Sequence, residues 1–241
     1  MTWGEAAALA TAVCWSFTAI LMSYSGRRVG ADVVNRSRLL FAFGLLAVAH
    51  WALEGSLFPT GVEPFRWGWL GLSSLLGLVL GDAFLFRAYV LIGPRLAMLL
   101  MAMVPIFGAV FGWWLFGEAV TRLELTGIGL AVAGGGLVVT GGQSDPPLAG
   151  RRVYRRGVLV GLLGALGQVA NLVTARYALV DDFPAISATL IRIAIGAVIV
   201  WALAALHGQA GETIRQWHDR RAVGGLGAAS FPRAVLGGWV S

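Results

Sequence analysis

The sequence predicts an all-α fold, a polytopic membrane helix bundle, from three observations. Of its 241 residues, 58% are hydrophobic and 12% are charged, about half the charged share of a typical soluble protein. The stretch 67–142 is almost wholly apolar. It divides into segments of about 20 residues, the length that crosses a roughly 30 Å hydrocarbon layer as a helix.

Arginine supplies all of the positive side-chain charge, and its placement argues against nucleic acid as a partner. The 18 arginines give the chain a net charge of +6. Most of them stand between apolar segments, where positive charge holds cytoplasmic loops in place. We therefore expect a lipid bilayer around the chain, and no nucleic acid. Cys14 is the single cysteine, so no intrachain disulfide can form.

Five spans are expected before residue 143: 6–22, 39–53, 67–92, 96–116 and 125–142. No basic segment precedes the first span, so we interpret it as retained and not as a cleaved signal. Gly26-Arg27-Arg28 is expected to end it. The second span extends back towards Val33.

Glycine and proline mark the ends and bends of the next two spans. Gly93-Pro94 is expected to end the third. Pro105 is expected to kink the fourth, where a freed carbonyl could serve a gate, and Gly117-Glu118 to cap its end.

The second part of the chain begins after a polar connector at 143–156. Two further spans are expected at 158–175 and 183–206, and a weaker one at 222–240 is interrupted by Pro232 and Arg233. The sequence therefore predicts seven or eight transmembrane helices.

An internal repeat organises these spans. An offset of 153 or 154 residues places Gly4 on Gly157 and Arg38 on Arg192. Five spans per unit is an odd number, so the second copy enters the membrane upside down, which is the inverted-repeat plan of secondary transporters. On this offset the second repeat is truncated by two helices. We expect a first repeat at 1–142, a linker at 143–156 and a partial second repeat at 157–241.

The first unit carries an ordered series of small, aromatic, charged and helix-breaking residues: Ala12, Cys14, Trp15, Arg38, Gly81-Asp82, Ala88, Ile92-Gly93, Pro105, Gly117-Glu118, Gly127 and Gly134 to Gly136. In order and spacing this series resembles the EamA-type repeat of the drug/metabolite transporter superfamily, over residues 4–142 fully and 157–241 in part. The resemblance implies a ten-helix secondary carrier of small metabolites such as amino acids or drugs, often an exporter.

Asp82 and Arg87 are ionisable residues inside the third span. A charge at the centre of a membrane helix costs about 2.5 to 3.5 kcal/mol, so it normally faces the protein interior and has a partner. Asp82 is expected to pair with Arg38 or Arg192, because Arg87 lies five residues away on another face of the helix. Two roles for Asp82 stay equally open: a coupling or substrate-binding carboxylate, or half of a structural ion pair. Arg87 is expected to extend to the interface.

Arg38 and Arg192 occupy equivalent places in the two units. Either they bind anionic groups bidentately, or they are interface arginines that start their helices. The interface interpretation is favoured for Arg38. Arg192 is the better site candidate, because it lies about 12 Å into a helix that starts near Pro184.

Gln168 and Asn171 lie three residues apart on one face of the sixth span, and Trp15 lies at the equivalent depth of the first. Amides in a membrane either hydrogen-bond across helices, at about 0.6 kcal/mol each, or line a solute path. Interhelical bonding is favoured for each amide taken alone.

Other chemistry lacks a signature in this sequence. The three histidines have no ligand spacing that would indicate a metal, and no GxSxG elbow is present. The run Gly134 to Gly136 lies inside a span, so it predicts no nucleotide loop. We expect no cofactor, no metal and no enzymatic activity.

These observations predict a multi-pass carrier of a small-molecule solute in the bacterial inner membrane, driven by a proton or substrate gradient. The alternative is a truncated copy that is inactive, or that works only by assembling with itself, as a homodimer, or with a partner. Eleven arginines follow odd-numbered spans and three follow even-numbered ones, which places the N-terminus outside. The family's ten-helix members usually have both ends inside, and both orientations stay open.

Overall fold

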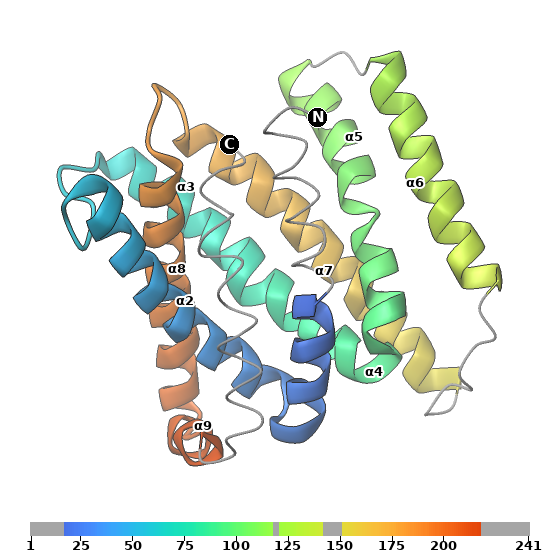
Figure 1. The fold of residues 1–241 in the computed structure, drawn as a ribbon, viewed down its shortest axis with the longest axis horizontal. Coiled ribbons are helices and arrows are strands. Elements are labelled where there is room, and N and C mark those ends of the chain that lie inside the picture. The colour runs from blue at the N-terminus through green and yellow to red at the C-terminus, as the bar shows by residue number, and fades with distance from the viewer. Residues whose placement is uncertain (1–16, 118–120, 142–150, 218–241) are drawn as a thin grey trace.

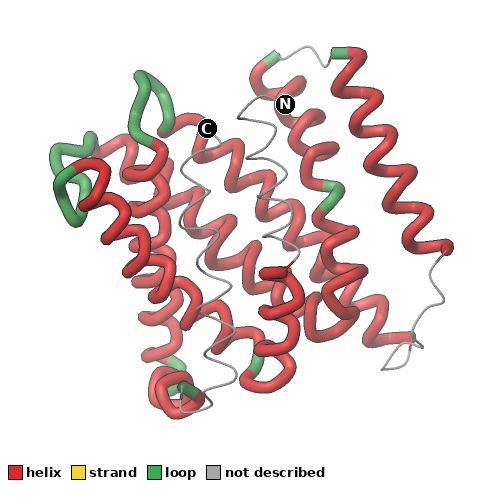
Figure 2. The backbone as a smooth tube through the Cα atoms, viewed as in Figure 1, coloured by secondary structure: helices red, strands yellow, loops and turns green. Residues whose placement is uncertain are grey.

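The computed structural model describes residues 17–117, 121–141 and 151–217, and every regular element in these ranges is a helix (Figures 1 and 2). The elements are a helix at 17–29, α2 (Ala31–Glu54), α3 (Pro64–Ser74), the π-helix η1 (Leu75–Gly81), α4 (Asp82–Met101), α5 (Val104–Phe116), α6 (Arg122–Gly141), α7 (Arg151–Ala178), α8 (Ala185–Leu206) and α9 (Ala210–Gln216). Within the described residues, four stretches are long and apolar enough to cross a membrane: Ala31–Glu54, Pro64–Met101, Arg152–Ala178 and Ala185–Leu206. The predicted all-α membrane bundle is confirmed.

The first two helices meet at a glycine corner. The helix at 17–29 continues past Gly26, so its predicted end there is wrong. It stops before Gly30, whose φ of 91° leaves the right-handed helical region. The helix α2 starts well before residue 39, as the predicted extension requires, and ends at Gly55 in the left-handed conformation typical of helix C-termini.

The third predicted span is a continuous helical rod with a π-helical segment in its middle. α3, η1 and α4 follow one another without a loop, and the Asp82 N–H donates to the Gly77 carbonyl, five residues back. The sequence did not predict this segment. Gly93, with φ 81° and ψ 164°, interrupts the rod where the break was expected. A π-helical segment is rare and frequently occurs at functional sites, and this one ends directly before Asp82.

The fourth predicted span consists of two pieces, so the expected single helix with a kink at Pro105 is corrected. The first piece ends at Met101, and Pro105 lies in the first turn of α5. Proline has no N–H to donate and its ring crowds the carbonyl four residues back, which is that of Met101. The last turn of α4 instead adopts the tighter 3₁₀ pattern, in which the N–H groups of Ala102 and Met103 donate to carbonyls three residues back. At the far end, Gly117 caps α5 with φ 65°, as predicted, while Glu118 lies outside the described residues.

The predicted linker also needs correction, because its arginine-rich half is helical. The helix α7 starts at Arg151 and runs for 28 residues, although the span was expected to begin at residue 158. Arginine is a good helix former, so the run of arginines is part of α7 and does not mark where the helix starts. Residues 142–150 lie outside the described ranges, as do 1–16 and 218–241, which contain Trp15 and the predicted eighth span.

A capping box starts α6. The N–H and Oγ1 of Thr121 donate to Glu124 Oε2 at 2.7 and 2.8 Å, and the Glu124 N–H donates back to Thr121 Oγ1 at 3.3 Å. The backbone and hydroxyl bonds from Thr121 hold the pKa of the exposed Glu124 carboxyl below its usual value. This reciprocal pattern satisfies amide donors that have no partner within the helix.

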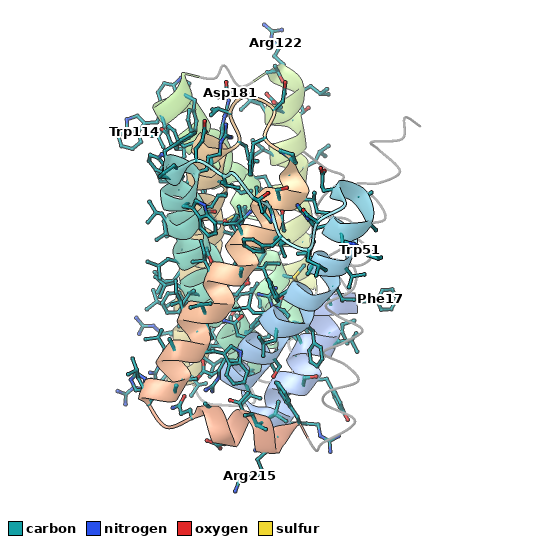
Figure 3. The ribbon with its side chains drawn as sticks, turned by 90° about the vertical axis from the view of Figure 1, so that its left-hand side faces the viewer. Phe17, Trp51, Trp114, Arg122, Asp181 and Arg215 are labelled. Atoms are coloured by element: carbon teal, nitrogen blue, oxygen red, sulfur yellow. The ribbon has the colours of Figure 1, made fainter. Side chains whose placement is uncertain are left out.

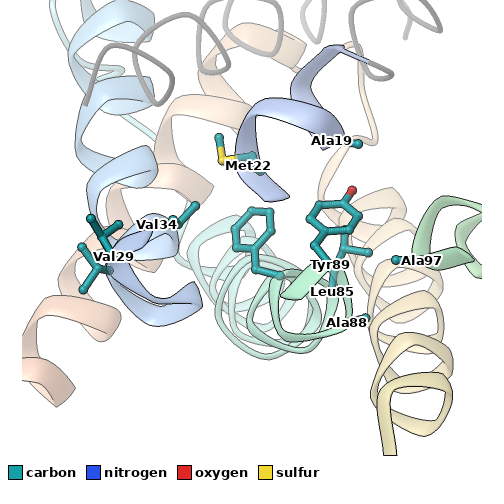
Figure 4. Close-up of a cluster of buried hydrophobic side chains, with 10 residues drawn as sticks. Ala19, Met22, Val29, Val34, Leu85, Ala88, Tyr89 and Ala97 are labelled. Atoms are coloured by element: carbon teal, nitrogen blue, oxygen red, sulfur yellow. The ribbon is translucent and has the colours of Figure 1, made fainter. Parts of the chain in front are cut away.

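Three apolar clusters form the core of the described bundle. The first joins the helix at 17–29, α2 and α4, through side chains that include Met22, Val34, Leu85 and Tyr89 (Figure 4). The second joins α2, η1 and α8, and the third joins α3 to α8. Because α2, η1 and α8 share one cluster, the polar side chains that these elements bury lie close to one another.

The rod formed by η1 and α4 crosses α7 at glycines of η1 and α7 that let the two backbones touch. A Cβ on Gly167 would lie 2.8 Å from Gly81 Cα and 2.9 Å from the Leu76 carbonyl oxygen, and one on Gly77 would lie 2.6 Å from the Asn171 side chain. Gly77 and Gly81 are therefore sites of close helix packing. At Gly108, by contrast, a Cβ would meet nothing within 4 Å.

The long helices alternate in direction, and the turns that connect them lie at the two ends of the bundle. The α2 and α8 ribbons run antiparallel (Figure 1). Arg122 and Asp181 lie at one end and Arg215 at the other (Figure 3). The turn between the helix at 17–29 and α2, the bend inside α4, the start of α7 and the helix α9 share one end of the bundle (Figure 1), and Arg215 marks this end (Figure 3). Most arginines of the described loops and helix ends therefore lie at this end, which we call the arginine-rich end.

Candidate functional site

An ion pair between α2 and α4 lies at the centre of the polar site. Arg38 Nη2 donates to Asp82 Oδ2, and the two side chains are 2% and 0% exposed. The Arg38 guanidinium lies 5.3 Å from the centre of the Phe86 ring. The prediction that Asp82 pairs with Arg38 or Arg192 is confirmed for Arg38.

The favoured interpretation of Arg38 as an interface residue is wrong. The helix α2 starts at Ala31, seven residues earlier, so Arg38 lies about 10 Å into the helix. At that depth it is level with Asp82. Arg36 is also buried, and it bonds to the backbone oxygens of Asp32 and Gln209.

Two amides of α7 continue the network from Asp82. Gln168 Nε2 donates to Asp82 Oδ1 at 2.9 Å, and Asn171 Nδ2 donates to Gln168 Oε1 at 3.4 Å. Both side chains are buried, at 7% and 6% exposure. Their predicted position on one face of the helix is confirmed, and that face points at the carboxylate.

Arg192 of α8 joins the same network from the other side. Its Nη2 donates to Asn171 Oδ1, which also accepts from Ser73 Oγ of α3 at 2.6 Å. Arg38, Asp82, Gln168, Asn171 and Arg192 thus form one hydrogen-bonded chain across α2, α4, α7 and α8. We call these five residues the central network.

Three polar residues that sequence reasoning missed hold this network in place. Asn35 Nδ2 donates to the Leu78 carbonyl of η1 at 3.3 Å, and Asn35 Oδ1 accepts from Arg38 at 3.4 Å. Ser73 bonds to Asn171, and Ser74 Oγ donates to the Arg192 carbonyl at 2.7 Å. The signals were present in the sequence: Asn35 stands one turn before Arg38, and the serine pair interrupts an apolar span.

The other predicted site residues lie away from the central network or outside the described residues. Arg87 forms a half-exposed ion pair with Asp32, at 3.1 Å, near the corner at Gly30. Pro105 is in the first turn of α5, and none of the described contacts of the central network involves it. Trp15 lies outside the described residues.

The central network brings together two guanidinium groups, one carboxylate and two amides in the interior of an apolar bundle. Electrostatic interactions are strong at such a place, and a change in the charge of Asp82 acts directly on Arg38 and Gln168. The amides offer both donors and acceptors to a polar solute. Among the described residues, no group of three His, Cys, Asp or Glu side chains is placed to hold a metal ion.

Comparison with known proteins identifies the family. A model of the EamA-like transporter family matches residues 2–140, which is more than half of the chain and includes Arg38 and Asp82. A search of curated proteins found no match. The resemblance noted in the sequence is therefore confirmed, and the chain belongs to the EamA-like transporter family.

Proposed function

We propose that the chain is a secondary carrier of a small organic solute, and that Asp82 is its coupling carboxylate. Family membership makes it a multi-pass membrane transporter of the drug/metabolite transporter superfamily. The observation that carries the proposal is the fully buried Asp82, held by Arg38 on one oxygen and Gln168 on the other. An intramembrane carboxylate of this kind is costly to bury and marks proton or ion relays in transporters.

The position of the central network supports this role. Arg38 and Asp82 belong to the first predicted unit, and Gln168, Asn171 and Arg192 to the second. Inverted-repeat transporters place their solute and coupling sites between the halves, near the midplane of the membrane. An ion pair that only held the register of adjacent helices would not need to extend across both units.

The geometry of the two arginines supports the inverted arrangement. Arg38 and Arg192 each lie seven residues past the first residue of their helix, α2 and α8. The two helices run in opposite directions (Figure 1). This is the relation expected of equivalent helices in two units that enter the membrane upside down.

A transport cycle follows from the charges. When a proton binds to Asp82, the carboxyl loses its charge and its attraction for Arg38, and the contact between α2 and α4 weakens. The amides Gln168 and Asn171, with Arg192, then rearrange around a polar group of the solute. Release of the proton on the other side of the membrane restores the ion pair. We propose export across a bacterial inner membrane, with Trp15 also beside the path.

The test is flux in proteoliposomes under an imposed pH gradient, with a labelled amino-acid mixture as the first solutes. We expect Asp82→Asn to abolish gradient-driven flux, because the amide cannot carry the proton. The matched control is Asp32→Asn, which removes the half-exposed carboxylate that pairs with Arg87. Because exposed ion pairs contribute about 0 to 1 kcal/mol, the control should keep flux within about a factor of two to three.

Both variants are first checked for insertion and for a monodisperse profile in detergent. Undiminished flux in correctly inserted Asp82→Asn would remove this carboxylate from the mechanism. Equal loss in both variants would attribute the effect to charge in general and not to the central network.

A further inference from the structure

A pocket at the start of α7 lies at the arginine-rich end of the bundle. Its volume is about 920 Å³, and its polar wall consists of Arg152, Arg155 and Arg156, with Tyr154 beside them. All four side chains are exposed. None of the described residues that line this pocket carries a carboxylate.

The remaining wall of the pocket is aliphatic and extends along α7 towards the middle of the bundle. It consists of Val158, Leu159 and Leu162. Leu159 is 58% exposed, and Leu163 and Leu166, on the same outward face, are each 40% exposed. The outward face of α7 therefore changes from arginine to leucine within about two turns.

The opposite face of α7 packs against α4. A Cβ on Gly157 would lie 2.3 Å from Ile92, and one on Gly161 would lie 2.5 Å from Leu100. These glycines hold α7 tightly against α4, so the arginines and leucines of the other face stay directed away from this contact. The helix thus presents a cationic and aliphatic surface on the side away from α4.

We propose that this pocket binds one anionic phospholipid, such as phosphatidylglycerol. The planar fork of arginine binds phosphate oxygens bidentately, and three arginines and one tyrosine line this pocket. The leucine face continues in the direction that an acyl chain takes from a headgroup at the interface. Basic pockets beside membrane helices bind acidic lipid headgroups in this way, and the three arginines among the described lining residues favour an anion over a zwitterion.

The experiment compares lipid retention by native mass spectrometry of the full chain in detergent. Phosphatidylglycerol and phosphatidylcholine with identical acyl chains are titrated separately. We expect the wild-type chain to retain phosphatidylglycerol preferentially, and the double variant Arg152→Gln/Arg155→Gln to lose about 25-fold in affinity, or roughly fivefold for each arginine. Arg152→Lys/Arg155→Lys, which keeps the charge but not the fork, should lose less.

The matched control removes two arginines from the same end but away from the pocket. Arg27→Gln/Arg215→Gln has the same net charge as the α7 double variant, and both replaced side chains are exposed. Retention of phosphatidylglycerol by this control supports a defined site. Equal loss in both double variants would overturn the proposal in favour of diffuse attraction, and no loss in either would overturn it outright.

Two further measurements distinguish a bound lipid from other occupants of the pocket. Inorganic phosphate should not displace the lipid, and Leu159→Asn should weaken its binding, because an acyl chain contributes. Displacement by phosphate would show a headgroup-sized anion site and overturn the lipid assignment. A wild-type chain without lipid preference, whose oligomeric state changes in the α7 double variant, would show instead that this face contacts a second copy.

Discussion

Each charge of the Arg38–Asp82 pair depends on the other for its place in the apolar interior. Arg38 is 2% exposed and Asp82 is fully buried, so neither side chain can turn to water when its partner is removed. Loss of one member of a buried pair leaves an uncompensated charge, which costs about 3 to 5 kcal/mol. Loss of both members leaves only neutral groups, at a much smaller cost.

This dependence gives a prediction for stability that is separate from transport. We expect Arg38→Gln to lower the free energy of unfolding by about 3 kcal/mol, and Arg38→Gln/Asp82→Asn to recover most of that loss. The measurement is reversible unfolding of the purified protein in mixed micelles. Additive losses in the double variant would mean that the two side chains do not interact in the folded protein.

At the scale of elements, the contact of α7 with the end of η1 and the start of α4 positions the central network. Gly81 and Gly167 let the two backbones touch one residue before Asp82 and one residue before Gln168. The bond from Gln168 to Asp82 is therefore a consequence of backbone proximity. Any side chain at the crossing would separate the amide from the carboxylate.

We predict that Gly167→Ala destabilises the bundle by about 1 to 3 kcal/mol and lowers flux, because its methyl group would meet the Gly81 backbone at 2.8 Å. The control is Gly129→Ala on α6, where a Cβ meets nothing within 4 Å and alanine is the better helix former. Thermal unfolding and proteoliposome flux are measured for both. Tolerance of Gly167→Ala would show that the crossing can widen without consequence.

At the scale of the molecule, the arginines are distributed unequally between the two ends. Among the described residues, the turn before α2, the bend inside α4, the start of α7 and the helix α9 carry most of them. The opposite end carries Arg122 (Figure 3) and Arg66, which donates to the Val180 carbonyl beside Asp181. Positive charge in short loops is retained on the cytoplasmic side during insertion. The arginine-rich end is therefore expected to face the cytoplasm.

Orientation is tested with single cysteines in a Cys14→Ser background. Glu212→Cys on α9 and Glu63→Cys before α3 report the two ends, and neither change removes an arginine. In intact cells we expect an impermeant maleimide to label Glu63→Cys and not Glu212→Cys. The reverse pattern would show that the arginine-rich end is outside.

The sequence alone determined the all-α class, the four membrane-length stretches found among the described residues and the main polar residues. Apolar segments of membrane length need no tertiary information, because only a helix satisfies its own backbone in lipid. Asp82, Gln168 and Asn171 were recognisable for the same reason, since polar groups in such segments require partners. The break at Gly93 and the cap at Gly117 were equally local signals.

Only the tertiary structure decided which partners meet. The depth of Arg38 depended on where α2 begins, and the pairing of Arg192 with Asn171 depended on the approach of α8 to α7. The π-helix before Asp82 arises from backbone hydrogen bonding that no residue pattern specifies. Pro105 indicated a disturbance of the fourth span, but only the structure showed that the span divides after Met101. Composition determines that a charge must be neutralised in lipid, but helix packing determines by which side chain.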